Sequence, residues 1–150
     1  MIRLMLICAI FCSAHNSFAQ LEKVMHQTFS VDADMSTIDL DLTGDYEFEY
    51  WAGSSIMTET KVELYESSPA ILNHFVEEAK RYEILADTLD TILRLHSLDK
   101  KREPIRRSQE KECPEIVNVK IFVPEDFEAS TSENKIFIRK KKLNVQEEKK

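Results

Sequence analysis

Residues 38–51 read IDLDLTGDYEFEYW, and the alternation in this stretch decides the fold class of the chain. Apolar and acidic side chains take turns on both sides of a TGD segment, at the period of two that is typical of half-buried strands. We therefore expect two strands, over 38–42 and 46–51, joined by a reversal in which Gly44 supplies a positive φ. We expect a positive φ at Gly53 for the same reason.

The same period continues along the chain and predicts further strands at 56–66, 82–86, 92–97, 116–123 and 135–139, with a short one at 127–130. The strand at 38–42 is expected to be the first of the fold. The segment 68–80 reads as a helix, because Ser68 suits an N-cap, Pro69 suits the first helical position, and apolar residues follow on one stripe as far as residue 79. We expect a mainly β domain, packed as a sandwich or a short β-solenoid, with this amphipathic helix covering one sheet face.

The N-terminal residues predict export. Arg3 precedes a short apolar run at 4–11, and small residues at 17 and 19 occupy the −3 and −1 positions of a cleavage site before Gln20. Residues 1–19 are therefore expected to be a cleaved signal peptide, and the mature protein to be periplasmic or extracellular. The apolar run is far shorter than the roughly 20 residues that cross a bilayer, so no transmembrane segment is expected.

The remaining chain divides into one domain and a tail. Residues 20–139 are enough for a single β-rich domain, and residues 140–150 form a charged tail that we expect to be disordered. Within the domain, residues 99–115 are rich in Lys and Arg and predict an exposed basic loop, either solvated or touching anionic lipid. The formal charge of −7 argues against a nucleic-acid partner.

Cys113 is the only cysteine after the predicted leader, so no disulfide within the mature chain is expected. Acidic neighbours at 112 and 115 oppose formation of a thiolate. We therefore expect a buried, unreactive side chain at this position.

The acidic residues of the first two predicted strands form a candidate metal site. If the strands pair as a hairpin, Asp41 lies opposite Glu47. Asp39 then lies opposite Glu49, with Asp45 at the turn. Like charges across a ladder repel each other, and a bound calcium ion, which prefers carboxylate oxygens, would relieve this repulsion. The repulsion is equally relieved if the strands are not partners but successive edges of a sheet that turns a corner, and no D-x-D-x-D-G calcium loop is present.

The aromatic residues Tyr46, Tyr50 and Trp51 form a candidate ligand-binding group for an envelope protein or polysaccharide, or else part of the core. No catalytic motif is found, since neither G-x-S-x-G nor H-E-x-x-H occurs, and no cofactor other than calcium is indicated. Paired carboxylates leave no local pattern, so a hydrolase acting on an envelope polymer is the alternative to a non-catalytic domain. A binding domain should show an exposed acidic or aromatic patch, whereas carboxylates converging in a pocket favour an enzyme.

The FAQ segment at 18–20 where the leader ends, the IDLDL repeat, the segment TFSV at 28–31 and the segment VKIFVP at 119–124 followed by Phe127 resemble the bacterial adhesin-like β-solenoid family. The resemblance covers residues 28–139. It implies a small exported protein with a structural or binding role in the cell envelope, and it implies no catalytic residues. The shortage of glycine and the helix after Ser68 depart from the repetitive members of that family and favour a compact, sandwich-like relative.

Overall fold

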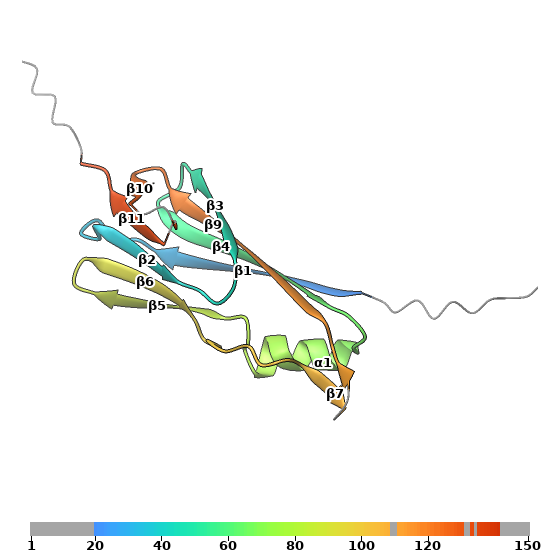
Figure 1. Cartoon of the computed structure of the whole chain (residues 1–150). Coiled ribbons are helices and arrows are strands. Elements are labelled where there is room, and N and C mark those ends of the chain that lie inside the picture. Colours follow the sequence, from blue (N-terminus) through green and yellow to red (C-terminus); the bar gives the residue numbers. More distant parts are fainter. Residues whose placement is uncertain (1–19, 109–110, 131–132, 134, 142–150) are drawn as a thin grey trace, which may run out of the picture.

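The computed structural model describes residues 20–108, 111–130, 133 and 135–141 (Figure 1). The predicted leader, and all but the first two residues of the predicted tail, lie outside these ranges. In the described ranges, no helix has the length and apolar character needed to cross a membrane.

One sheet, sheet A, has the strand order β1-β4-β9-β3. Its strands are β1 (Leu21–Ser30), β4 (Ser55–Leu64), β9 (Glu115–Pro124) and β3 (Tyr46–Trp51). The first three are antiparallel neighbours, whereas β3 runs parallel to β9. The three long strands continue past the end of the other sheet and over the helix (Figure 1).

The second sheet, sheet B, has the order β10-β11-β2-β6-β5. Its strands are β10 (Phe127–Ala129), β11 (Ile136–Arg139), β2 (Thr37–Asp41), β6 (Ile92–Ser97) and β5 (Ile84–Leu89). The central strand β2 is antiparallel to β11 and parallel to β6. Because the chain passes repeatedly between the two sheets, most pairings join residues that are far apart in sequence.

The main core lies between the facing surfaces of the two sheets. Burial alternates strictly along β4, where every second side chain is buried, so the period of two in the sequence is confirmed. Both sheets contribute to this core, which is a sandwich, one of the two predicted packings. Its buried members are Met35, Ile38, Leu40, Ile56, Ile84, Leu93, Leu95, Val119, Ile121, Val123, Phe127 and Phe137.

The helical segment covers the overhanging end of sheet A, as predicted. It begins as α1 (Pro69–Asn73) and continues as a π-helical turn, η1 (His74–Glu78). The Ser68 hydroxyl accepts a hydrogen bond from the Ile71 N–H at 3.4 Å, which confirms the N-cap. Apolar side chains of the segment pack in a second buried cluster with the ends of β4 and with the 105–113 region.

The strand β1 was missed by the sequence analysis, which placed the first strand at 38. Its inward positions alternate between apolar residues and the polar Lys23 and Gln27, so the period of two is masked. Lys23 pairs with Glu77 at 3.3 Å, and the Gln27 side-chain amide bonds both the N–H and the C=O of Ile84. These polar side chains are therefore satisfied by partners from the helix and from sheet B.

The basic segment 99–115 is more than an exposed loop. It contains the short strands β7 (Arg106–Ser108) and β8 (Lys111–Glu112), and it includes the first residue of β9. Ile105 and Cys113 are buried in the second cluster, and the Cys113 N–H donates to the Ile105 C=O at 2.8 Å. Burial of Cys113 is confirmed.

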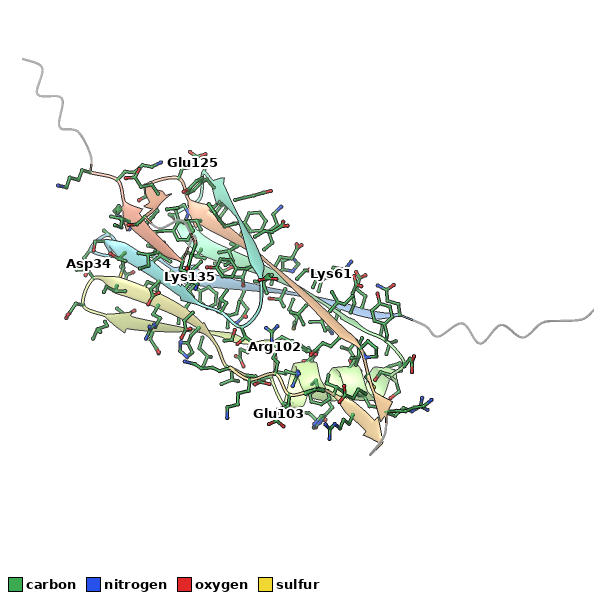
Figure 2. All side chains as sticks on the ribbon, viewed as in Figure 1. Asp34, Lys61, Arg102, Glu103, Glu125 and Lys135 are labelled. Atoms are coloured by element: carbon green, nitrogen blue, oxygen red, sulfur yellow. The ribbon has the colours of Figure 1, made fainter. Side chains whose placement is uncertain are left out.

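Hydrogen bonds from the buried Arg81 side chain join the segment 99–115 to the rest of the fold. Arg81 is 6 % exposed, and its guanidinium donates two hydrogen bonds of 3.0 Å to the Glu115 carboxylate. It also donates to Asp99 at 3.2 Å and to the Glu103 C=O at 2.7 Å. The Tyr82 hydroxyl donates to Glu115 at 2.5 Å, and burial, together with this bond, raises the pKa of that hydroxyl. Figure 2 shows Glu103 on this loop beside the helix.

Candidate functional site

The strands β2 and β3 separate after the reversal that connects them. Gly44 has a φ of 87°, as predicted, but β2 then pairs with β6 and β11, whereas β3 pairs with β9 in the other sheet. The predicted hairpin, with Asp41 opposite Glu47, is therefore wrong. The alternative in which the strands are not partners is the one that occurs, and it separates the like charges.

An open cleft of about 820 Å³ lies where the two strands diverge. Leu42 and Phe48 contribute apolar side chains to it, and Phe48 packs edge-to-face on Phe137 with ring centroids 5.0 Å apart. Acidic side chains outnumber basic ones along the walls. The acidic members are Asp39, Asp41, Asp45, Glu47 and Glu133, and the basic members are Arg94 and Lys135.

Three of the cleft carboxylates are paired with cations. Asp39 accepts from the Arg94 Nε at 3.0 Å, and Asp41 accepts from the Lys100 Nζ at 3.3 Å. The third pair joins Glu133 to the Lys135 Nζ at 2.6 Å, and this bond lowers the pKa of the Glu133 carboxyl.

The predicted calcium site does not form as a cluster. Asp39, Asp41, Asp45 and Glu47 line the cleft, but Glu49 lies on the outer face of sheet A, 2.8 Å from the Lys120 Nζ. Among the described residues, no group of three or more His, Cys, Asp or Glu side chains is placed to hold a metal ion. The premise of the prediction, repulsion across a hairpin, is removed by the separation of the strands.

The Tyr46 side chain lies at the cleft, where it also packs against the main core. Its hydroxyl has a raised pKa, chiefly because of burial, with Asp39 and Glu133 acting in the same direction and Lys135 opposing them. The hydroxyl is therefore protonated at neutral pH and brings a hydrogen-bonding group to the wall of the cleft.

The other two predicted ligand-binding aromatics lie elsewhere and form structural contacts. The Tyr50 hydroxyl accepts a bond from the Ala129 N–H at 3.0 Å, which ties β3 to β10. The Trp51 indole donates to the Ser55 C=O at 2.9 Å and lies over Gly53. A Cβ at position 53 would be 2.1 Å from the indole, so glycine is required there by close approach, and the predicted positive φ is wrong.

Arg94, Lys135 and Glu133 also line the cleft and were not predicted from the sequence. Arg94 reaches the cleft because the parallel register of β2 and β6 sets it opposite Asp39. Lys135 arrives at the start of β11, and its C=O accepts from the Leu40 N–H at 2.8 Å. Both placements depend on pairings between distant segments, and no local pattern reveals them.

A scan against family models and searches of curated proteins and of solved structures found no match to this chain.

Proposed function

We propose that the protein is a non-catalytic binding domain of the bacterial cell envelope, and that it holds a cationic segment of another envelope protein in the cleft between β2 and β3. The observation that carries this proposal is the charge of the cleft, whose walls include five acidic and two basic residues. A concave site with excess charge of one sign attracts a ligand of the other sign.

The unpaired carboxylates give the cleft its binding capacity. Asp45 and Glu47 have no salt-bridge partner among the described residues, in contrast to the three paired acids. Both also border a second hollow of about 320 Å³ on the outer face of sheet A, beside Lys61 and Lys120. A lysine or arginine entering the cleft therefore meets two exposed acceptors at its mouth.

The location is proposed from the leader at 1–19 and from the resemblance to adhesin-like proteins, which support export to the periplasm or the exterior. A polysaccharide is the other class of envelope ligand that an exported domain meets. The excess of carboxylates favours the cationic protein segment over a neutral sugar chain, because a sugar gains nothing from the net charge.

A specific observation also supports the alternative, a hydrolase with paired carboxylates. Acidic side chains do meet at a pocket, which is the arrangement expected of an enzyme. A general acid must keep its proton at neutral pH, however, and needs a raised pKa. Glu133 has a lowered one, and Asp39 and Asp41 are bonded to cations, so the binding function is the better supported of the two.

Removing the two unpaired carboxylates tests the proposed function. We expect Asp45→Asn combined with Glu47→Gln to weaken binding of a fluorescein-labelled tetralysine peptide by about tenfold, since two charge contacts of 0.5–1 kcal/mol are lost. Fluorescence anisotropy at low salt measures the affinity, which should fall as salt is added.

The matched control is Asp34→Asn combined with Glu125→Gln. It removes the same charge from two exposed positions at the other end of the molecule from the helix (Figure 2). Its affinity should stay within about twofold of the unmodified protein. Equal losses in both double variants, or no binding by the unmodified protein, would contradict the proposed function.

The protein for this titration is made with its own leader and recovered from the periplasm or the medium. Its intact mass should correspond to a chain that begins at Gln20. A chain that keeps Met1 and stays in the cytoplasm would contradict the proposed location.

A further inference from the structure

An exposed apolar row crosses the outer face of sheet B. The register sets Leu89 opposite Ile92, Ile92 opposite Thr37, and Thr37 opposite Ile138, so these four side chains lie side by side on four neighbouring strands. Leu89 is 70 % exposed, Ile92 37 % and Ile138 43 %. Large apolar side chains gathered in this way mark a contact surface more often than scattered ones do.

A charged row borders the apolar one. Asp87 lies opposite Arg94, and Arg94 lies opposite Asp39. Arg94 bonds Asp39, and the remaining contact of Asp87 is with the His96 Nδ1 at 3.4 Å. Asp87, on the outermost strand, is therefore an exposed carboxylate with no Lys or Arg partner among the described residues.

The hydrogen bonds of β5 show which of its backbone N–H and C=O groups point away from β6. The Gln27 amide bonds the N–H and the C=O of Ile84 from the side away from β6, at 3.0 and 2.9 Å. On the side that faces β6, the Leu98 N–H donates to the Glu83 C=O at 2.9 Å. A bond in this position flanks a non-hydrogen-bonded pair of an antiparallel ladder, so Ile84 and Ser97 form such a pair.

In β5, backbone groups that point toward β6 alternate with groups that point away from it. Since the Ile84 groups point away from β6, the N–H and C=O groups of Ala86 and Thr88 do so too. Their side chains are exposed, as are those of Asp87 and Leu89. Beyond Ile84, whose backbone bonds Gln27, β5 thus presents an unpaired strand edge to solvent.

The other edge strands carry features that hinder pairing. β1 has the inward polar side chains Gln27 and Lys23, Tyr50 ties β3 to β10, and β10 itself has only three residues. The outer half of β5 has no proline, lysine or bulge, the devices that block pairing at an edge.

We propose that the free edge of β5 binds an extended segment of a partner protein, which adds a strand to sheet B. The segment exchanges backbone hydrogen bonds with Ala86 and Thr88. Its outward side chains read apolar, then basic, then apolar at alternate positions, because they lie beside Leu85, Asp87 and Leu89.

A second copy of this chain fits the edge less well. The two-fold register that packs Leu89 on Leu85 of the second copy also sets Asp87 directly opposite Asp87, and like charges in that position repel. A basic residue of a different protein, placed opposite Asp87, forms an ion pair with it instead. The free edge of β5 is separated from the cleft by β6, whose Arg94 lines the cleft and lies opposite Asp87.

The test uses the peptide acetyl-Thr-Ile-Thr-Arg-Thr-Leu-Thr-amide, labelled for fluorescence anisotropy, and a twin N-methylated on alternate backbone nitrogens. The twin keeps every side chain but loses the donors of one edge, so we expect its affinity for the unmodified protein to be at least about tenfold lower. Equal binding of the two peptides, or binding of neither, would overturn the proposal.

Variants of β5 locate the peptide. Thr88→Pro removes an outward N–H that the β5–β6 ladder does not use, and should weaken binding by about tenfold, whereas Thr88→Val keeps the N–H and should stay within twofold. If Thr88→Pro fails to fold, the N-methylated twin still decides the question.

Two further results would overturn the proposal in distinguishable ways. Loss of peptide binding in the Asp45→Asn, Glu47→Gln double variant would assign the peptide to the cleft and leave the proposed function standing. Dimerisation of the free protein in light scattering, abolished by Leu89→Lys, would assign the edge to a second copy.

Discussion

Replacing Arg81 with methionine is expected to lower the free energy of unfolding by about 3–5 kcal/mol, because the change leaves the Glu115 carboxylate, which is only 14 % exposed, without its cation. Glu115 would lose both bonds from the guanidinium, and Asp99 and the Glu103 C=O would lose one each. The methionine side chain fills much of the space but donates no hydrogen bond. Urea unfolding followed by far-ultraviolet circular dichroism measures the loss.

The matched control is Arg106→Met, an exposed arginine of the same loop that meets Glu112 at 3.5 Å. Exposed pairs of this kind contribute at most about 1 kcal/mol. Similar losses for the two variants would show that Arg81 does not anchor the segment 99–115 as described.

Truncating Phe137 to alanine should destabilise the fold by about 3–5 kcal/mol, since the ring is fully buried and its removal leaves a cavity. Phe137 contacts Phe48 edge-to-face, with an interplanar angle of 76°, and so joins β11 of one sheet to β3 of the other beneath the cleft.

The control for this change is Ile138→Ala on the same strand, which points to the outer face and is 43 % exposed. Its loss should stay within about 1 kcal/mol. If thermal or urea unfolding gave equal losses for the two neighbours, the assignment of inner and outer faces in β11 would be wrong.

The sequence predicted those parts of the fold that depend on local pattern. Alternation in 38–51 and in β4 predicted strands, and Ser68 with Pro69 predicted the start of the helix. The strand predicted at 82–86 lies at Ile84–Leu89 because Tyr82 belongs to the second buried cluster. The strand β1 was missed, since its inward Gln27 is satisfied only by a backbone 57 residues away.

The candidate site was predicted only in part, for the same physical reason. Four of the five acidic residues of the cleft were predicted, all but Glu133, whereas the separation of β2 from β3 depends on parallel pairings with β6 and β9. The cations that neutralise three of the acids come from β6, from the basic loop and from the start of β11. Arg94 and Lys100 lie 55 and 59 residues from Asp39 and Asp41, so repulsion in a hairpin was the simplest local interpretation.

The cleft exists only because β2 and β3 separate. Nuclear Overhauser contacts between backbone protons of the labelled protein test this separation most directly. The structure predicts contacts of Glu47 with the strand segment around Lys120, and of Asp41 with the segment around His96. A direct contact between the α-protons of Asp41 and Glu47, which a hairpin requires, would contradict the account.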